Sequence, residues 1–329
     1  MAYQAGDAIL DNEYNDFVGS SSDPFGINHT AGTGSAQYGL GESAVATVSA
    51  GGAITAAQWN SLWTAMNTAA HHTNVNTGGG AGVLASTAAV STGDAIAIKA
   101  ALITDLAALA TAVAAGSADA TALTTSSSLQ AITTASEGWD NSATHEHSIT
   151  FTSADRMRHF FNAGGKVRIV TSTTQGTTNP KDQAFIDLGA AIGNLDIGSQ
   201  ATTRSGTGET QTTDGLANGF HDLTASYAVI LKLTSDNSNY TSNTVEISAK
   251  LDAAVGTAVT MTIKMVATDP SSDAQYTQGN TDVPSGGDGD IKDTPRMVTN
   301  LYAITPNTSQ GLTTSPAHAS VAATSNTVV

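Results

Sequence analysis

The sequence predicts an α+β protein in which a small helical N-terminal region is followed by an antiparallel β-sandwich. Two patterns indicate this arrangement. In the first half of the chain, apolar side chains recur every three or four residues, which is typical of helices that bury one face. In the second half, short apolar runs alternate with polar residues between Gly, Asn, Asp, Ser and Pro turns, which is typical of antiparallel strands.

These patterns divide the 329 residues into four parts. Residues 1–50 mix short apolar runs with spaced glycines and are expected to form an extended arm. Residues 51–137 are expected to form a helical module, and residues 138–305 the β-sandwich module. Residues 306–329 are a tail rich in Thr, Ser and Ala, which alone could bury little apolar surface.

Two helices are expected in the helical module. The first begins after Ile54 with Thr55 as its N-cap, and its apolar stripe consists of Trp59, Leu62, Trp63 and Met66. It ends before the glycine run at 78–80. The second helix spans about 93–115, with Asp94 near its start and a seam of Ile98, Leu102, Leu106, Leu109 and Val113. This seam can pair with the first helix or with another copy; we favour the first because large side chains are scarce.

Strands are expected from about residue 145. In 147–153, Ile149 and Phe151 alternate with polar residues, and in 165–174, Val167 and Ile169 share one face. Further strands are expected at AFIDLG (184–189), SYAVILKLTS (226–235), NTVEISAKLD (243–252), AVTMTIKMVATD (258–269) and MVTNLYAITP (297–306). A long polar loop is expected at 271–290.

A short helix is expected between the first two strands. Ser153 is its N-cap, Asp155 lies in its first turn, and Gly164 or Gly165 ends it. Phe160 and Phe161 fall on its last turn, and Asn162 is expected to cap the helix through its side chain. We interpret this segment as a structural corner rather than a catalytic site.

Large aromatic side chains are candidate anchors. Tryptophan and phenylalanine are typical both of cores and of interfaces, and the core is the simpler interpretation. The candidate structural or interface anchors are Trp59, Trp63, Trp139, Phe160 and Phe161.

The charge composition favours some partners over others. Only 12% of the residues are charged, whereas ordinary soluble domains contain about 25%. Surfaces with so few charges are cheap to desolvate, which favours extensive contact between subunits. The net charge is −16, and no cluster of Lys and Arg indicates binding to nucleic acid or to an anionic membrane. We therefore expect neither partner.

Other function classes lack their sequence signals. The chain contains no cysteine, so disulfides, thiolate metal sites and a cysteine nucleophile are excluded. No secretory signal or membrane helix is expected, which indicates synthesis in a cytoplasm. A Gly-x-Ser-x-Gly elbow, a His-Glu-x-x-His helix and a phosphate-binding Gly-x-x-x-x-Gly-Lys loop are also absent from the sequence. We expect a protein that is not an enzyme and needs no cofactor.

One pair of residues resembles part of a metal site. His145 and His147 flank Glu146 and would share one face of a strand. Two imidazoles could bind zinc, nickel or iron if a second copy supplied further ligands. Two ligands from one chain do not complete such a site, so the simpler interpretation is a pair of surface or hydrogen-bonded histidines.

Three blocks of the sequence carry a family resemblance. They are GTGSAQYGLG at 32–41 together with VSAGGAITAAQWNSLWTAMNTAAHHTN at 48–74, then GWDNSATHEHSITFTSADRMRHFFNAGGKVRIV at 138–170, and YTSNTVEISAKL at 240–251. In this order the blocks resemble virion structural and tail-associated proteins of tailed bacteriophages, notably phages of marine cyanobacteria. Within the central block, SADRMRHFFNAGG is the most specific part, and His159 and Lys166 depart from the usual residues.

The resemblance implies a structural protein of a tailed-phage virion, assembled in the host cytoplasm. Its place would be the tail, baseplate or tail-fibre apparatus, as a trimer or higher homo-oligomer in contact with other virion proteins. A head decoration or collar protein is one alternative. Others are an adhesin that binds a host surface glycan through loops around Tyr240 or Tyr276, and an array-forming microbial surface protein.

Overall fold

The computed structural model describes residues 10–20, 25–86, 91, 99–133, 142–174, 180–237, 240–270, 296–306 and 318–328. Trp139, Asp94, Ile98, Tyr276 and the expected loop at 271–290 lie outside these ranges. The chain forms two compact units. Unit 1 comprises residues 1–124, 153–165 and 304–317, and unit 2 comprises residues 125–152, 166–303 and 318–329. The predicted fold class is confirmed, since a few helices accompany two antiparallel β-sheets that pack together.

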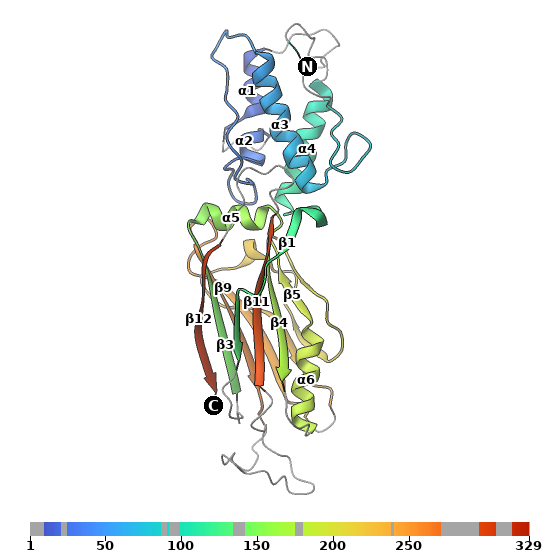
Figure 1. Cartoon of the computed structure of the whole chain (residues 1–329), viewed down its shortest axis with the longest axis vertical. Helices are drawn as coiled ribbons and strands as arrows, with labels where there is room; N and C mark the ends of the chain where they lie inside the picture. Colours follow the sequence, from blue (N-terminus) through green and yellow to red (C-terminus); the bar gives the residue numbers. More distant parts are fainter. Residues whose placement is uncertain are drawn as a thin grey trace, which may run out of the picture. The chain divides into compact units, whose positions relative to one another are not determined.

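Unit 1 is helical. In chain order its helices are α1 (Asp11–Val18), α2 (Ile27–Thr30), α3 (Ala56–Thr73), α4 (Lys99–Ala114), the 3-10 turn η1 (Ala120–Ala122) and α5 (Ala154–Asn162) (Figure 1). Its apolar core is made by residues of α1, α2, α3 and α4 and of the segments between them. The boundaries of α5 at Ser153 and of α3 at Thr55 agree with the predicted N-caps.

The first 50 residues differ from the expected extended arm. Helix α1 buries Tyr14, Phe17 and Val18 in the core of unit 1, because these residues fall on one side of a helix. Two asparagine side chains then hold the segment at 45–48 in place. Asn15 bonds both backbone groups of Val48, and Asn28 bonds both backbone groups of Val45, at 2.8 and 2.9 Å in each case. The region is thus an integral layer of the helical unit.

Helix α3 follows the sequence prediction closely. The Thr55 hydroxyl accepts a hydrogen bond from the backbone N–H of Gln58, and the Gln58 side chain accepts one from the Thr55 N–H. The helix stops at Thr73 because Asn74 adopts the left-handed conformation, with φ of 59°, before the glycine run is reached. Trp59, Leu62 and Met66 are buried in the core, as the stripe predicted.

Helix α4 packs against α3 within the same chain. Its seam of Leu102, Leu106, Leu109 and Val113 belongs to the same apolar core as the α3 stripe. The prediction of an intramolecular helix pair is confirmed. The opposite side of α4 is exposed and carries Ala100, Ile103, Thr104, Ala107 and Thr111, none of which is charged.

Unit 2 is a sandwich of two sheets, each with six strands. One sheet has the order β1-β11-β4-β5-β6, with β2 paired to β11, and the other has the order β12-β3-β10-β9-β8-β7. The strands are β1 (Leu123–Thr125), β2 (Gln130–Thr133), β3 (Ser142–Phe151), β4 (Lys166–Thr174), β5 (Asn194–Ile197), β6 (Thr202–Arg204), β7 (Thr210–Asp214), β8 (Ala228–Thr234), β9 (Thr244–Leu251), β10 (Thr260–Thr268), β11 (Arg296–Pro306) and β12 (His318–Val328). A 3-10 turn, η2 (Phe220–Asp222), precedes β8.

The alternation predicted for the strands places their apolar residues inside the sandwich. In β3 every second residue from Ala143 to Phe151 is buried. Val167 and Ile169 of β4 are buried too, while Arg168 on the other face forms two hydrogen bonds with the carboxylate of Asp196, at 2.7 and 2.8 Å. The period of two therefore set which face of each strand packs inward.

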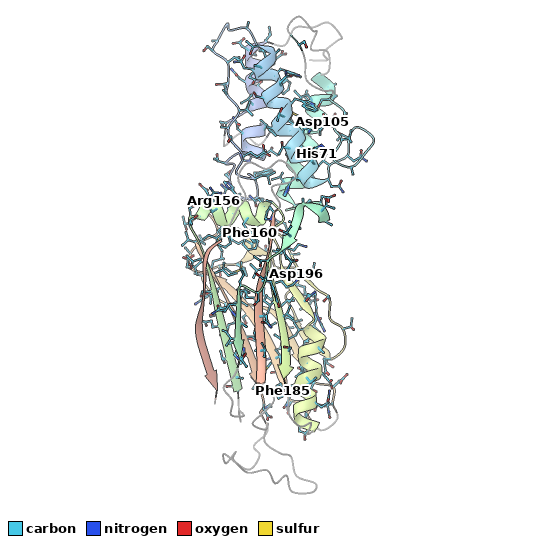
Figure 2. The ribbon with its side chains drawn as sticks, in the orientation of Figure 1. His71, Asp105, Arg156, Phe160, Phe185 and Asp196 are labelled. Atoms are coloured by element: carbon cyan, nitrogen blue, oxygen red, sulfur yellow. The ribbon has the colours of Figure 1, made fainter. Side chains whose placement is uncertain are left out.

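One predicted strand is wrong: AFIDLG lies within helix α6 (Pro180–Ile192). Short apolar runs fit a strand or a helix equally well, and the longer window decides between them. Within that window the buried residues are Ala184, Phe185, Leu188, Ala191 and Ile192, which is helical spacing (Figure 2 labels Phe185). Pro180 at the start favours the helix, as does the hydrogen bond of 2.7 Å between the side chains of Gln183 and Asp187.

The C-terminal tail also differs from its prediction. Residues 318–328 form β12, which pairs antiparallel with β3 at the edge of a sheet. Small polar side chains bury little, but a strand needs only backbone partners, and β3 offers a row of them. The composition of the tail therefore gave no signal of its pairing.

The capping box of α3 gives a direct test of this fold. Thr55→Ala removes the hydroxyl that accepts the Gln58 N–H, so the free energy of unfolding should fall by about 1 kcal/mol. Urea denaturation followed by circular dichroism measures the change. Ser61→Ala is the matched control, because the Ser61 hydroxyl is exposed and only bonds the carbonyl of Ala57 on the same helix. Equal losses in both variants would contradict the assigned cap.

Candidate functional site

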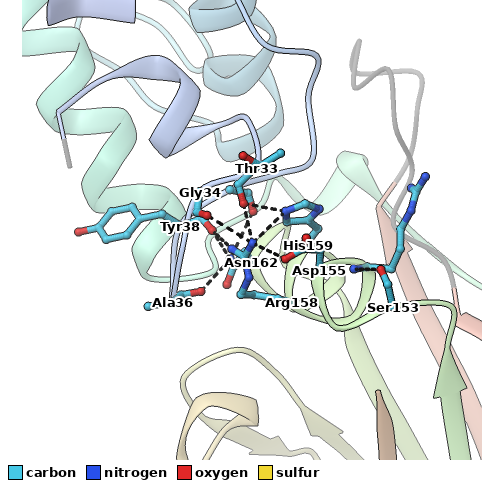
Figure 3. Close-up of polar contacts among 11 residues, drawn as sticks. Thr33, Gly34, Ala36, Tyr38, Ser153, Asp155, Arg158, His159 and Asn162 are labelled. Atoms are coloured by element: carbon cyan, nitrogen blue, oxygen red, sulfur yellow. Dashed lines mark hydrogen bonds and ion pairs between the residues drawn. The ribbon is translucent and has the colours of Figure 1, made fainter. Parts of the chain in front are cut away.

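The most specific polar arrangement in unit 1 joins α5 to the loop at 33–41, and we call it the α5 cluster (Figure 3). The two segments lie more than 110 residues apart in the chain. Side chains of α5 donate hydrogen bonds to backbone carbonyls of the loop. The cluster thus brings together sequence features that were predicted separately.

Arg158 supplies the charge of the α5 cluster. Its guanidinium donates to the carbonyls of Tyr38 and Thr33, the latter at 2.5 Å, and forms an ion pair of 3.0 Å with Asp155 one turn earlier. The Arg158 side chain is only 6% exposed, whereas that of Asp155 is 68% exposed. Because an arginine has five donors in a fixed plane, it can satisfy several carbonyls of a tight loop at once.

Asn162 binds the same loop rather than capping its own helix, so the predicted cap is corrected. Its side-chain amide donates to the carbonyls of Tyr38 at 2.8 Å and of Ala36 and Gly39 at 3.3 Å each. The side chain is fully buried. Helix α5 ends at Asn162 with Ala163 as its C-cap residue, followed by Gly164 with φ of 78°.

His159 completes the α5 cluster. Its Nε2 is 3.0 Å from the carbonyl of Thr33 and donates a hydrogen to it. Burial lowers the pKa of His159, and the hydrogen bond to the Thr33 carbonyl partly opposes this by raising it. Gly41 makes room for the ring: it has φ of 78°, and a Cβ there would lie 2.7 Å from Nδ1 of His159.

A second buried histidine ties α3 to the end of α5. His72 donates from Nε2 to the carbonyl of Ala163 at 2.8 Å, and the His72 carbonyl accepts from the N–H of Asp119. Burial is the main cause that lowers the pKa of His72. The adjacent His71 is exposed, so the two rings point in different directions.

Asp105 is the one buried carboxylate of α4, and it organises the loop after α3 (Figure 2). One of its oxygens accepts from the Thr77 hydroxyl at 2.5 Å and the Ala85 N–H at 3.1 Å, and the other accepts from the Ser86 N–H at 2.8 Å. Three donors therefore satisfy a charge on an otherwise apolar helix face. No sequence motif signals this role.

The buried polar side chains of unit 1 described so far mainly bond backbone groups. Arg158, His159 and Asn162 donate to carbonyls, and Asp105 accepts from donors that it holds in place. A buried group that is already paired in this way is not available to a substrate without first breaking those bonds. The chemistry of the α5 cluster is thus the ordering of a loop.

The histidines predicted as metal ligands lie inside unit 2. His145 and His147 point from β3 into the sandwich and are 0% and 1% exposed. The shared face was predicted correctly, and His145 is hydrogen-bonded to Thr299 as one of the alternatives predicted. A surface position, and the supply of further ligands by a second copy, do not fit such burial. Around them, the described residues hold no group of three or more His, Cys, Asp or Glu.

The tautomer of His145 follows from its contacts. The Thr299 hydroxyl donates its hydrogen to Sδ of Met265 at 3.2 Å, and a thioether cannot donate in return. The oxygen of Thr299 therefore accepts from Nδ1–H of His145 at 2.9 Å. This arrangement leaves Nε2 of His145 as an unprotonated nitrogen that has no hydrogen-bond partner within the described ranges.

Burial keeps both rings neutral. Desolvation lowers the pKa of His145 and of His147 from 6.5 to about 4 each, and the neighbouring ring adds to the effect at His145. His145 faces Met265 and His147 faces Ile263 on β10, so no charged side chain of that strand opposes the shift. Neither ring can act as a proton carrier near neutral pH while the sandwich stays closed.

The candidate anchors are mainly internal. Trp59, Phe160 and Phe161 are at most 3% exposed, and the two phenylalanine rings meet edge to face with centroids 5.1 Å apart. Trp63 is half-buried and donates from Nε1 to the carbonyl of Ser86 at 3.3 Å. Buried aromatics stabilise their own unit, which leaves Trp63 as the described anchor with a partly open ring.

On the outward face of the sheet that contains β3, charged side chains contact Tyr227 or each other. The Tyr227 hydroxyl donates to Glu146 at 2.7 Å, while the ammonium groups of Lys250 and Lys264 lie 4.5 and 4.1 Å from the centre of the Tyr227 ring. A third lysine, Lys232, pairs with Glu246 at 3.3 Å. These contacts offset the positive charges locally, and each is worth at most about 1 kcal/mol at such exposure.

Comparison with known proteins gives no match, whether with family descriptions, curated proteins or solved structures. No helix within the described ranges has the length and apolar character needed to cross a bilayer. The function of the chain must accordingly be inferred from its own geometry and motifs.

The α5 cluster predicts the effect of a single substitution. Asn162→Ala removes the donor to the buried carbonyl of Gly39 and to those of Ala36 and Tyr38, so the free energy of unfolding should fall by about 1–3 kcal/mol. Arg156→Ala on the same helix is the control, because Arg156 is partly exposed and should cost less than about 0.5 kcal/mol. Urea denaturation measures both. A loss in Asn162→Ala no larger than in the control would refute the role given to Asn162.

The buried imidazoles predict sensitivity to acid. Their pKa values are lower in the folded chain than in the unfolded one, so the unfolded chain binds protons first and the free energy of unfolding falls as the pH drops from 6.5 toward about 4. Since one pKa unit corresponds to about 1.4 kcal/mol, the pair accounts for several kcal/mol over this range. His147→Leu should flatten the dependence of unfolding free energy on pH in metal-free protein. His71→Leu, at an exposed position, should leave it steep.

Proposed function

We propose that this protein is a structural subunit of a tailed-phage virion, in the tail, baseplate or tail-fibre apparatus, and that it acts by homo-oligomeric assembly. One observation carries the proposal: the two motif blocks that resemble such virion proteins meet in the α5 cluster, where their polar groups bond backbone carbonyls of one loop. Residues that order a loop fit a structural role better than a catalytic one.

The charge distribution supports assembly as the mode of action. Helix α3 has no charged residue along its 18 positions, and the exposed side of α4 presents Ala100, Ile103, Thr104, Ala107 and Thr111. Ile103 is 49% exposed. Contact between such surfaces removes apolar area from water without stripping water from ions, so it costs little to desolvate. The proposed partner of this helical surface is another copy of the chain.

The glycan-binding alternative has less support. Tyr240, which was a candidate for a sugar-binding loop, is only 7% exposed, and a side chain buried to this degree offers no stacking face to a sugar. No described feature favours a head decoration or collar protein over a tail component. The proposed location in the tail apparatus therefore rests on the sequence resemblance alone.

Assembly predicts a concentration-dependent oligomer. Sedimentation velocity of the purified chain should give a homo-oligomer, and added salt should not dissociate it, because the proposed contacts are uncharged. Ile103→Lys places a charge on the exposed side of α4 and should shift the distribution to monomer. Thr203→Lys, at an exposed position on β6, is the control and should stay assembled.

The virion assignment has its own test. Mass spectrometry of purified phage particles should detect the protein, and its gene should lie among genes for tail proteins. A chain that remains monomeric at all concentrations, occurs in no particle and hydrolyses a substrate would contradict the proposed function.

A further inference from the structure

Unpaired nitrogen atoms inside the sandwich call for an explanation. Nε2 of His145 and both ring nitrogens of His147 are buried and have no hydrogen-bond partner in the part of the chain that the structure describes. A buried polar atom without a partner costs about 1–3 kcal/mol, and native proteins usually satisfy such atoms with a water molecule or an ion. These three nitrogen atoms belong to two neighbouring inward residues of β3, and we take their proximity as a sign of a bound water molecule or ion.

His145 has the orientation of a metal ligand. Its Nδ1–H donates to the hydroxyl of Thr299, which fixes the tautomer and turns the lone pair of Nε2 into the interior. Metal-binding histidines usually hold their second nitrogen in such a hydrogen bond, because it orients the ring and increases its basicity.

The surroundings select the kind of ion. His147 lies two residues along β3 on the same face, so the two rings are neighbours. On β10 they face Met265 and Ile263, and the Met265 sulfur is held at Thr299, beside His145. The lining is therefore neutral, with imidazole nitrogen and thioether sulfur as the donor atoms. Among the residues whose placement is known, no carboxylate cluster is present to offset a double charge.

We propose that His145 and His147 bind one copper(I) ion inside the sandwich, with Met265 as a neighbouring soft ligand. Copper(I) carries a single charge, accepts two or three neutral ligands and favours imidazole and thioether donors. Zinc(II) fits less well, because it requires four ligands and brings a second charge into an apolar interior. This site is independent of the proposed virion role.

The ion must enter while the chain folds, because both rings are closed off from solvent. The test therefore unfolds the full chain in urea and refolds it without oxygen in the presence of copper(I). Excess copper is then removed with a colorimetric copper(I) chelator. The natural chain should retain one equivalent of copper per chain and should unfold at a temperature several degrees above that of the copper-free protein.

Matched variants distinguish this site from incidental binding. His145→Leu and His147→Leu should lose the retained equivalent and the rise in unfolding temperature, while circular dichroism confirms that they fold. His71→Leu removes an exposed histidine and should retain copper as the natural chain does. Copper lost from the natural chain to the chelator, retention unchanged in His147→Leu, or preferential retention of zinc(II) in a parallel refolding would each overturn the proposal.

Discussion

The hydrogen bonds from α5 to the carbonyls of the loop at 33–41 are the constraint on which the helical unit depends. This loop turns tightly and carries positive φ angles at Gly34, Ala36, Gly39 and Gly41, so its carbonyls cannot all pair within regular structure. Arg158, His159 and Asn162 supply donors from a distant part of the chain. In a protein with so few charged and large residues, such bonds fix a conformation that apolar packing alone would leave loose.

Charged residues are also few in the second unit. The sandwich is closed by alternating apolar strands. On one face Glu146 and Lys264 both contact Tyr227, and Glu246 forms an ion pair with Lys232. Two histidines occupy interior positions where an aliphatic residue would pack at lower cost. Residues that reduce stability without serving the fold often serve a function, which is the reason for the copper(I) proposal.

Local sequence patterns predicted the helices α3, α4 and α5 and six of the twelve described strands, because helix caps and alternating apolar residues act over short distances. The same rules failed at 184–189, where a six-residue run carries no information on its period, and at 318–328, whose strand depends on the free edge of β3. Asn162 illustrates the limit for the candidate site. Its partners lie more than 120 residues away, so no window around it could reveal them.

The central claim is that α5 and the loop at 33–41 form one cooperative element of structure. Amide hydrogen exchange of the natural chain tests it most directly. The N–H groups of Gly39, Leu40, Gly41 and Glu42 bond carbonyls of residues 30–32. We predict that these amides and those of α5 have equally high protection against exchange and lose this protection together as urea is added. Rapid exchange in the loop while α5 stays protected would contradict it.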